Sequence, residues 1–237
     1  MLKLIKKKLN IVILVGGKGK RLGKLTKNTP KPLLKIKKNV FLDYLIDYIF
    51  KNIININKIY FIAGYLGNEI KKKYSMTKNS NYYKFLIEKK IEGTGRAIFK
   101  FKKYFQSNDT IILNGDTLFK INFKKFINFS LSSKKKIIIA LAENKNYKSN
   151  SKLANLRLIE DSIYFSNKKN LMNGGIYFIK KNYLVNLKKE MKSFENDFLS
   201  KLIKKQLISG IKFNGKFIDI GTPKNLNFAK KNFLKLN

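Results

Sequence analysis

The sequence predicts an α/β fold, and three patterns along its 237 residues lead to this expectation. In the first half, short apolar runs alternate with stretches whose apolar residues recur at helical spacing, which is typical of βαβ units around a parallel sheet. In the second half, short strand patterns separated by turn residues are more typical of antiparallel pairs. The chain is 44% hydrophobic and 13% aromatic, which is enough to fill the core of one large domain.

Strands and helices are expected in turn along the first half. The helix predicted over 41–54, for example, repeats apolar residues at Phe41, Leu45 and Ile49. The expected elements are strands over 11–15, 58–63, 84–88 and 110–113 and helices over 41–54, 66–74 and 95–105. Ligands of such sheets bind beyond the carboxyl ends of the strands. This rule selects four segments that we expect along one edge, namely 16–21, 63–66, 88–94 and 114–116.

The second half is expected to mix strands, hairpins and helices. An Asn-Gly pair is typical of a tight hairpin turn, and a proline with its fixed φ is typical of the first turn of a helix. The expected elements are strands over 136–142 and 174–179, a hairpin over 153–165 turning at Glu160-Asp161, a helix over 194–208, a hairpin over 211–220 around Asn214-Gly215 and a last helix after Pro223.

The residue types that are absent exclude several classes of chemistry. The chain has no His, which excludes Ser-His-Asp and Cys-His catalysis and imidazole metal sites. It has no Cys, which excludes disulfides, zinc fingers, iron–sulfur clusters and thiol chemistry. A metal ion bound by this chain is therefore expected to be a hard cation held by oxygen atoms.

The charge balance is strongly basic. With 52 Lys+Arg against 14 Asp+Glu, the formal net charge is +38, which favours a basic nucleic-acid-binding protein as an alternative function. Only Arg21, Arg96 and Arg157 are arginines, whereas proteins that read bases or phosphates bidentately favour Arg. Lys, Asn, Ile and Phe are abundant together and share A/T-rich codons. We therefore attribute most of the charge to codon bias and expect no specific nucleic-acid partner.

The N-terminal residues 1–15 contain a basic stretch at 6–8 and an apolar run at 11–15. Five apolar residues are too few for a secretory signal and far too few for a membrane-spanning helix. The absence of Cys agrees with a reducing compartment. We expect a cytoplasmic protein without a membrane span.

A glycine-rich loop, GGKGKRL at 16–22, directly follows the first predicted strand. Its glycines let the backbone approach a phosphate, and Lys18, Lys20 and Arg21 add positive charge, so we interpret it as a phosphate-binding loop rather than a plain turn. It is not a Walker A loop, because no Ser or Thr follows a Gly-Lys pair. Leu22 replaces the third glycine of the dinucleotide-binding fingerprint, which weighs against an oxidoreductase.

One lysine and two carboxylates also have unusual surroundings. Two prolines flank Lys31 and fix the backbone on either side, which would present its ammonium rigidly. Asp116 and Asp219 each follow an apolar strand pattern and have a glycine nearby. Carboxylates at the ligand edge of a sheet are typical of Mg²⁺ sites that also use substrate phosphates, although each could instead cap a turn.

Seven motifs, taken in order, resemble those of the sugar-1-phosphate nucleotidyltransferases. They are GGKGKRL at 16–22, PKPLL at 30–34, EKKIEGTGRA at 88–97, LNGDT at 113–117, MNGGIYFI at 172–179, SFENDFL at 193–199 and FIDIGTP at 217–223. Together they cover nearly the whole chain. The short length and the last motifs are most similar to the D-glycero-D-manno-heptose 1-phosphate guanylyltransferase branch, with mannose-1-phosphate guanylyltransferases close behind.

The resemblance implies a three-layer Rossmann-like fold of the GT-A type with a mixed, mostly parallel central sheet. It implies one domain over 1–237, in which 1–135 bind the nucleotide and 136–237 bind the sugar and complete the metal site. The implied reaction joins GTP and D-glycero-D-manno-heptose 1-phosphate into GDP-heptose for surface polysaccharide and releases pyrophosphate. Mannose-1-phosphate guanylyltransferase, or another sugar-1-phosphate uridylyl- or thymidylyltransferase, is the alternative. A homo-oligomer is compatible with either.

The resemblance also implies roles for single residues. Arg21, Lys31 and Lys168 would be catalytic, because they would contact the pyrophosphate, the α-phosphate and the sugar phosphate, respectively. The implied nucleotide-binding residues are Val15, Gly16, Gly17, Gly19, Lys20, Glu88, Gly93 and Thr94. The implied sugar-binding residues are Gly115, Asn173, Gly174 and Glu195, and the implied Mg²⁺ ligands are Asp116 and Asp219.

Three departures from the family's pattern bear on the sugar rather than on the reaction. Lys20 stands where the family has Thr. Asn167 stands where the family has the Glu of a Phe-x-Glu-Lys element, whose Lys is matched here by Lys168 or else by Lys169. The family's Arg-Tyr-Gly segment is not recognisable in residues 147–155.

Overall fold

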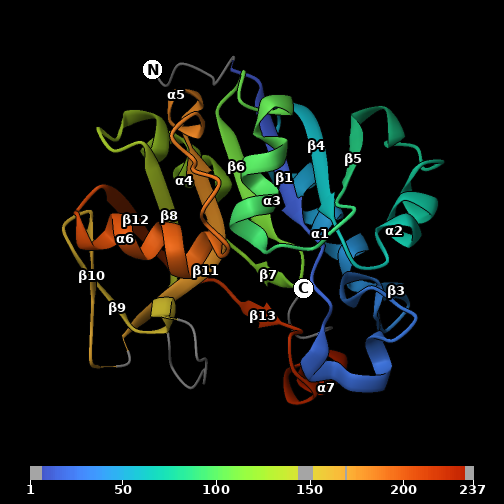
Figure 1. Cartoon of the computed structure of the whole chain (residues 1–237). Coiled ribbons are helices and arrows are strands. Elements are labelled where there is room, and N and C mark those ends of the chain that lie inside the picture. Colours follow the sequence, from blue (N-terminus) through green and yellow to red (C-terminus); the bar gives the residue numbers. More distant parts are fainter. Residues whose placement is uncertain (1–6, 144–151, 169, 233–237) are drawn as a thin grey trace. The chain divides into compact units, whose positions relative to one another are not determined.

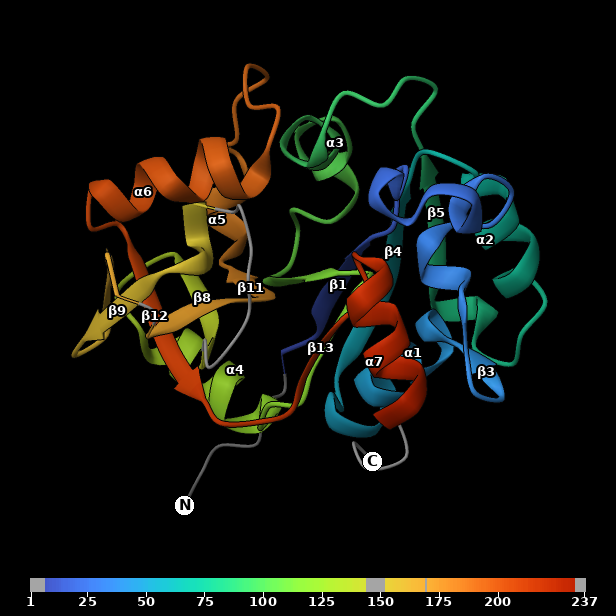
Figure 2. The same ribbon diagram turned by 90° about the horizontal axis from the view of Figure 1, so that it is seen from below.

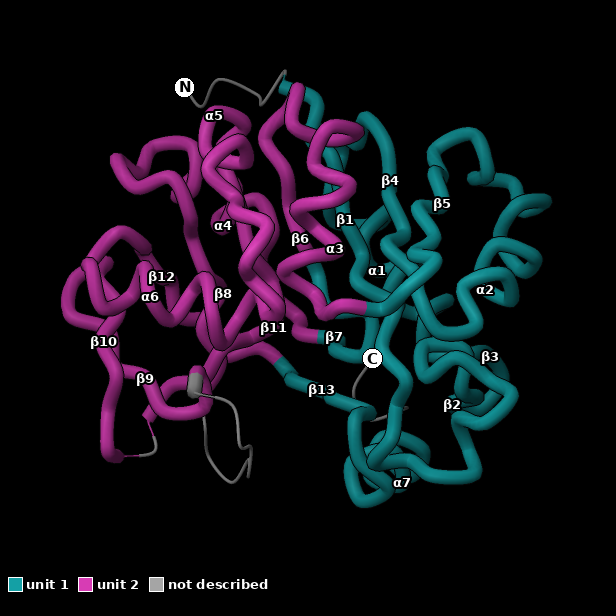
Figure 3. Tube along the Cα trace, in the orientation of Figure 1, with its two compact units in different colours: residues 1–91, 113–118, 216–237 teal, residues 92–112, 119–215 magenta. Residues whose placement is uncertain are grey.

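The structure of the chain is a computed structural model that describes residues 7–143, 152–168 and 170–232. It forms two compact units, and each unit is assembled from separate stretches of the chain (Figure 3). Unit 1 is made of Met1–Ile91, Leu113–Leu118 and Lys216–Asn237, and unit 2 of Glu92–Ile112 and Phe119–Gly215. The functional division expected at residue 135 stays a prediction.

Unit 1 contains a parallel sheet with the strand order β5-β4-β1 (Figure 1). Strand β4 (Ile56–Ala63) pairs in parallel with β1 (Leu9–Leu14) on one side and with β5 (Tyr83–Ile87) on the other. Ile11, Val12 and Ile13 of β1 are all fully buried, as expected of a continuous apolar run that is covered on both faces. The carboxyl ends of these strands therefore meet at one edge of the unit.

The helices of unit 1 follow the predicted apolar spacing. Helix α1 (Phe41–Asn52) buries Phe41, Leu45 and Ile49 along one face, and its first turn is closed by Asp43, whose Oδ2 accepts the Val40 N–H at 3.3 Å. The other elements of unit 1 are the helices α2 (Gly67–Tyr74) and α7 (Pro223–Asn232), the 3₁₀ turns Lys20–Thr26, Lys31–Leu33 and Ser80–Tyr82, and the short strands β2 (Lys35–Ile36), β3 (Asn39–Val40) and β13 (Phe217–Asp219). The short strand β7 (Thr117–Phe119) begins in unit 1 and ends at the first residue of the next stretch of unit 2.

Unit 2 contains a mixed sheet with the strand order β6-β11-β8-β12-β10-β9. Among its described pairs, β12 and β8 are parallel, whereas β11–β8, β10–β12, β10–β9 and β11–β9 are antiparallel. The strands are β6 (Thr110–Asn114), which leads into unit 1, β8 (Ile137–Glu143), β9 (Leu156–Ile159), β10 (Ser162–Phe165), β11 (Leu171–Ile179) and β12 (Ile208–Phe213). Antiparallel pairing therefore predominates in this unit.

Helices cover both faces of the unit 2 sheet. Figure 2 shows α4 (Phe123–Ser132) on one side of strands β8 and β12 and α6 (Ser200–Lys204) on the other. The remaining elements are the helices α3 (Thr94–Phe101) and α5 (Lys181–Leu184), the π-helix Phe194–Leu199 and the 3₁₀ turns Lys102–Tyr104 and Lys152–Ala154.

The expected α/β class is confirmed, and so are the strands and helices of the first half to within a few residues. The hairpin that turns at Glu160-Asp161 is also confirmed, because β9 and β10 pair in antiparallel fashion across it. The helix expected over 194–208 is shorter, because the backbone of Gln206 is left-handed at a φ of 55° and β12 begins at Ile208. Helix α4 was not anticipated.

The hairpin predicted over 211–220 is wrong. Strand β12 pairs in parallel with β8, and β13 pairs with β7 instead. A Cβ at Gly215 would overlap the carbonyl oxygen of Lys120, so this glycine allows a close backbone approach rather than a tight hairpin turn. The Asn214-Gly215 pair therefore marks the passage of the chain from unit 2 back to unit 1.

Within the described ranges of the chain, no helix has the length and apolar character needed to cross a bilayer. The cytoplasmic location and the oligomeric state stay predictions. Two sequence interpretations, the one on residues 147–151 and the one on Lys169, fall outside the described residues.

Candidate active site

The glycine-rich loop lies in unit 1 between β1 and the 3₁₀ turn that starts at Lys20. A Cβ at Gly16 would lie 2.8 Å from the backbone nitrogen of Gly64, so only glycine permits this close approach. Gly19 has a φ of 64°, and its carbonyl accepts the Thr26 hydroxyl at 3.1 Å. Apart from Gly17 itself and its two neighbours in the chain, no described residue has an atom within 4 Å of a Cβ placed at Gly17. The middle of the loop is therefore open, while both ends are held.

Glu88 lies near this loop at the end of β5. Its side chain is buried, with 8% of the residue exposed, and its backbone N–H donates to the carbonyl of Ala63 at 2.8 Å. A Cβ at Gly64 would lie 3.3 Å from Glu88 Oε2 and 3.1 Å from the carbonyl oxygen of Gly16. The expected gathering of segments at one sheet edge is thus confirmed for the part in unit 1. Gly64 itself was missed, although the rule on strand ends had selected its segment.

Lys31 and Asp116, which are 85 positions apart, form an ion pair in unit 1 through Lys31 Nζ and Asp116 Oδ2. Lys31 starts a 3₁₀ turn, and this turn is closed by the Leu33 N–H donating to the carbonyl of Pro30 at 2.8 Å. The two side chains are only 14% and 20% exposed. Burial raises the pKa of the Asp116 carboxyl, but the Lys31 charge and several hydrogen bonds outweigh burial and hold that pKa below its usual range. Asp116 is therefore ionised.

Asp219 lies close to this pair because Ile220 N donates to the carbonyl of Asp116 at 3.0 Å. Asp219 Oδ1 accepts the Gly221 N–H at 2.6 Å and the Asn225 amide at 3.2 Å. The turn-capping alternative therefore holds for this oxygen. A Cβ at Gly221 would lie 2.9 Å from Asp219 Oδ1 and 3.0 Å from Arg21 Nη2, so Gly221 allows the guanidinium and the carboxylate to come close.

Asp116 and Asp219 fit a Mg²⁺ ion by the chemistry of their donor atoms. Both present carboxylate oxygens, which hard cations prefer, and the Ile220–Asp116 hydrogen bond brings the two strand ends together. Among the described residues, no group of three His, Cys, Asp or Glu side chains is placed to hold a metal. Two carboxylates supplemented by substrate phosphates are a usual arrangement for Mg²⁺.

In unit 2, two of the predicted sugar-binding residues are in contact. Asn173 of β11 donates from Nδ2 to Glu195 Oε1 at 2.9 Å. Glu195 lies in the first turn of the π-helix, and π-helical turns are frequent at functional sites. The third predicted residue of this unit, Gly174, is buried, and a Cβ there would lie 2.5 Å from the Phe119 ring and 2.6 Å from the carbonyl oxygen of Ala140. Close packing explains that glycine.

Gly93 and Thr94, at the start of α3, hold the segment that leads to Glu195. A Cβ at Gly93, whose φ is 106°, would overlap the carbonyl oxygen of Lys192. The Thr94 hydroxyl accepts the Phe194 N–H at 3.0 Å. Within unit 2, Thr94 is therefore hydrogen-bonded to the backbone next to Glu195, and Gly93 packs closely against the same segment.

The remaining predicted residues are buried by packing or exposed. Gly115 packs against the end of β1, because a Cβ there would lie 2.5 Å from Val15 Cγ1. Lys20, Arg21 and Lys168 are exposed side chains on loops or turns. The roles that the resemblance implies for all these residues stay predictions.

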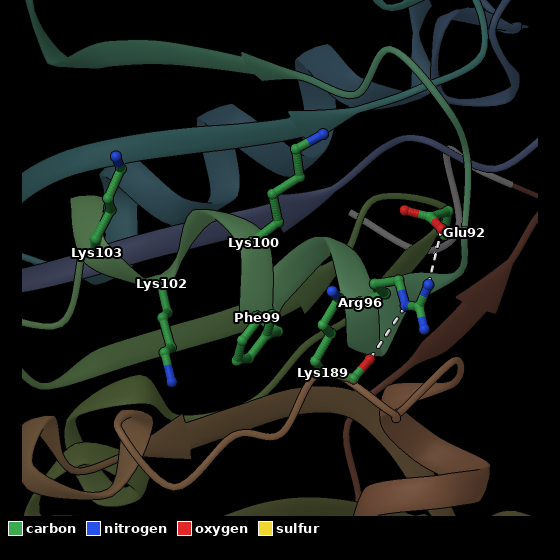
Figure 4. Close-up of a pocket in the computed structure, with 7 residues that line it drawn as sticks. All are labelled: Glu92, Arg96, Phe99, Lys100, Lys102, Lys103 and Lys189. Atoms are coloured by element: carbon green, nitrogen blue, oxygen red, sulfur yellow. Dashed lines mark hydrogen bonds and ion pairs between the residues drawn. The ribbon is translucent and has the colours of Figure 1, made fainter.

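A pocket of about 440 Å³ in unit 2 lies beside α3 (Figure 4). Arg96 is fixed in it by Glu92 Oε1 at 2.8 Å and by the carbonyl of Lys189 at 3.1 Å. Figure 4 shows the ammonium groups of Lys100 and Lys103 pointing away from that of Lys102, so the cations do not converge on one ligand. The pocket is lined by Glu92, Arg96, Phe99, Lys100, Lys102, Lys103 and Lys189.

Comparison with known proteins gives consistent matches. The profile described as Nucleotidyl transferase matches residues 10–153. The chain is 32% identical over 228 residues to D-glycero-alpha-D-manno-heptose 1-phosphate guanylyltransferase of Aneurinibacillus thermoaerophilus, covering 93% of this chain and 96% of that protein. It is 29% identical over 243 residues to Bifunctional protein GlmU of Methanococcus vannielii, covering 96% of this chain and 55% of that protein. The chain thus spans about half the length of that relative.

Solved structures agree with these matches. HddC from Yersinia pseudotuberculosis has a TM-score of 0.77 and 28% identity, with 94% of this chain and 99% of that chain covered. The complex of HddC with GMP-PN has a TM-score of 0.73 and 27% identity, and the match covers 94% of this chain and 99% of that chain. This likeness confirms the predicted Rossmann-like fold of the GT-A type.

Proposed function

The chain belongs to the nucleotidyl transferase family, and from this premise we propose that it transfers a nucleotidyl group from an NTP to a sugar 1-phosphate and releases pyrophosphate. The proposed substrates are GTP and D-glycero-D-manno-heptose 1-phosphate, which give GDP-heptose as a precursor of surface polysaccharide. We prefer these substrates because of the share of each relative's length that the chain matches. The match spans 96% of the heptose 1-phosphate guanylyltransferase but only 55% of the GlmU protein.

The proposed reaction is an in-line displacement at the α-phosphorus. An oxygen of the sugar phosphate forms a bond to the α-phosphorus. At the same time, the bond between the α-phosphorus and the oxygen that bridges the α- and β-phosphates breaks. Pyrophosphate leaves with the bonding electron pair. No covalent enzyme intermediate is required, so positioning and charge neutralisation supply the catalysis. This suits a chain that has neither His nor Cys.

In unit 1, the contacts support the assignment of three groups to the phosphates of the substrates. Lys31 is held by its proline-flanked turn and by Asp116, so its ammonium is preorganised to neutralise charge that builds at the α-phosphate. Arg21, whose guanidinium lies at Gly221, is assigned to the departing pyrophosphate. The open backbone around Gly17 is assigned to the triphosphate.

Asp116 and Asp219 are the residues that would hold Mg²⁺. A bound Mg²⁺ would supply a Lewis acid that polarises the phosphoryl oxygens and a template that orients them. The chain's own contribution is to keep Asp116 ionised through Lys31 and to bring the two strand ends together through the Ile220–Asp116 hydrogen bond.

In unit 2, the assignments concern the sugar and the base. Glu195 and Asn173 are assigned to hydroxyl groups of the sugar, because their contact presents a carboxylate and an amide together. Exposed Lys168 is assigned to the sugar phosphate. Gly93 and Thr94 are assigned to the edge of the base.

A substrate matrix tests the proposed function. GTP, dTTP, UTP, CTP and ATP are each combined with heptose, mannose, glucose and N-acetylglucosamine 1-phosphates, and pyrophosphate release is measured. We expect the highest kcat/KM with GTP and the heptose 1-phosphate, and no release when NTP, sugar 1-phosphate or Mg²⁺ is omitted. A preference for another pair would keep the reaction but replace the substrates. No release from any pair, together with tight DNA or RNA binding at about 0.2 M salt, would favour the nucleic-acid alternative.

Replacing Gly221 with Ala tests the cluster of Arg21 and Asp219. The added methyl would press on the flexible tips of both side chains rather than on backbone, so we expect a Tm within about 2 °C of the native protein. Because a misplacement of about 1 Å can cost about 100-fold in rate, we expect kcat/KM to fall by about 10- to 100-fold. Pyrophosphate release and thermal denaturation are the two measurements.

Gly174→Ala is the contrasting variant for this test. Its methyl would meet the buried Phe119 ring and the backbone of Ala140, so a destabilisation of about 1–3 kcal/mol and a clearly lower Tm are expected. Gly221→Ala with native kcat/KM would contradict a role for the Arg21 and Asp219 cluster.

A further inference from the structure

Tyr177 of β11 is a fully buried tyrosine whose hydroxyl group donates a hydrogen bond to Glu195 Oε1. Asn173 Nδ2 donates to the same hydroxyl oxygen at 2.7 Å and to Glu195 Oε1 at 2.9 Å. The amide of Asn173 is oriented in turn, because its Oδ1 accepts the Gly175 N–H at 3.0 Å. Two fixed donors therefore meet one oxygen of the Glu195 carboxylate.

The backbone around Glu195 is held by other groups. Asp197 Oδ2 accepts the N–H groups of Lys192 at 3.0 Å and Ser193 at 2.8 Å, and the Thr94 hydroxyl accepts that of Phe194 at 3.0 Å. These contacts fix the path of the backbone but not the direction of the Glu195 side chain. The Asn173 and Tyr177 donors of β11 hold one oxygen of that carboxylate.

A purely structural aromatic residue at position 177 would not need its hydroxyl. The Tyr177 ring packs edge-on against Phe194 at 5.2 Å between centroids, and phenylalanine would make the same contact. A buried hydroxyl is costly unless it is hydrogen-bonded, so its presence here follows from the carboxylate and the amide that it joins.

We propose that Tyr177 is a positioning residue of the sugar site, which aims the carboxylate of Glu195 at sugar hydroxyl groups. The proposal rests on the proposed function, in which Glu195 faces the sugar. Tyr177 acts through Glu195 and does not itself contact the substrate. Its hydroxyl restricts a side chain with three rotatable bonds to one orientation, so removing the hydroxyl weakens sugar binding without moving the backbone.

The test compares Tyr177→Phe with Tyr74→Phe. Tyr74 is a matched control in unit 1: it is also a buried tyrosine, 4% exposed, whose hydroxyl donates to a carboxylate oxygen, Asp43 Oδ1, at 2.6 Å. Both variants lose one hydroxyl and one hydrogen bond to a carboxylate. We expect Tyr177→Phe to raise KM for the sugar 1-phosphate about 5- to 20-fold, with KM for the NTP unchanged, and Tyr74→Phe to change neither KM.

A double variant shows whether Tyr177 acts through Glu195. Glu195→Gln alone is expected to raise KM for the sugar 1-phosphate more than Tyr177→Phe, and the double variant is expected to match Glu195→Gln alone. Multiplied effects in the double variant, or a native sugar KM in Tyr177→Phe, would overturn the positioning role while leaving the proposed reaction in place. Absence of turnover in the native protein would overturn both. Equal changes of KM in Tyr177→Phe and Tyr74→Phe would show that the changes come from general destabilisation, and would contradict the positioning role.

Discussion

Asp116→Asn is expected to lower kcat/KM for nucleotidyl transfer by about 1,000-fold, and Asp219→Asn to lower it by a similar factor. An amide oxygen is a weaker ligand than a carboxylate for a hard cation, and metal assistance is worth several kcal/mol at the transition state. Since about 1.4 kcal/mol changes a rate tenfold, the loss of about 4 kcal/mol gives the expected factor. Asp116→Asn also removes the negative charge that holds Lys31 in place.

The measurement is pyrophosphate release over a range of Mg²⁺ concentrations, together with Mn²⁺ binding followed by electron paramagnetic resonance. In both variants the Mg²⁺ concentration for half-maximal rate should rise, and Mn²⁺ binding should weaken. Asp47→Asn is the control, because Asp47 is an exposed acid on the outer side of α1 and should behave like the native protein. Native rates in Asp116→Asn and Asp219→Asn would show that these two carboxylates hold no catalytic metal.

The parts of the fold that the sequence predicts well are those with a local cause. Strand β1 is covered on both faces, so its residues form an unbroken apolar run that is visible in the sequence. Helix α4 had a comparable signal, which was overlooked: Asn122 caps its first turn by accepting the Lys125 N–H at 2.9 Å, and Phe123, Phe126 and Ile127 are buried along one face.

The wrong hairpin shows where a local pattern is overruled. Asn214-Gly215 favours a tight turn, but the strands on either side of it have other partners, β8 and β7, which lie far away in the sequence. Pairing with distant strands buries more apolar surface than a short isolated hairpin would, so tertiary contacts decide. The pairing of β12 with β8 and of β13 with β7 therefore cannot be predicted from residues 211–220 alone.

For the candidate site, the sequence indicates single residues, whereas the structure shows which of them are in contact. Strand ends beside glycines pointed to Asp116 and Asp219, with turn capping as the alternative, and the flanking prolines were only a weak signal for Lys31. The roles of all three came from the resemblance to the family. Neither pattern revealed that Lys31 and Asp116 touch, because that contact joins positions 85 residues apart. Tyr177 was missed because an aromatic residue in an apolar strand indicates core, and only the coordinates show where its hydroxyl points.

Lys31→Met is expected to lower kcat by about 100- to 1,000-fold with little change in KM for the NTP. Methionine keeps the length of the side chain but removes the ammonium, and loss of one preorganised group that stabilises charge in the transition state has about this effect. The effect falls on kcat because the negative charge at the α-phosphate grows during the reaction, so the ammonium interacts more strongly with the transition state than with the substrate. Steady-state kinetics of pyrophosphate release give both constants.

Lys35→Met is the control for the loss of one charge, because Lys35 is exposed on β2 in the same unit and should keep the native kcat. The double variant Lys31→Met/Asp116→Asn tests whether the ion pair acts as a unit. Groups in direct contact do not contribute independently, so the double variant should lose less than the product of the two single losses. A fully multiplicative loss would mean that Lys31 and Asp116 act on separate parts of the substrate. A native kcat in Lys31→Met would mean that the lysine serves only to hold Asp116 in the fold.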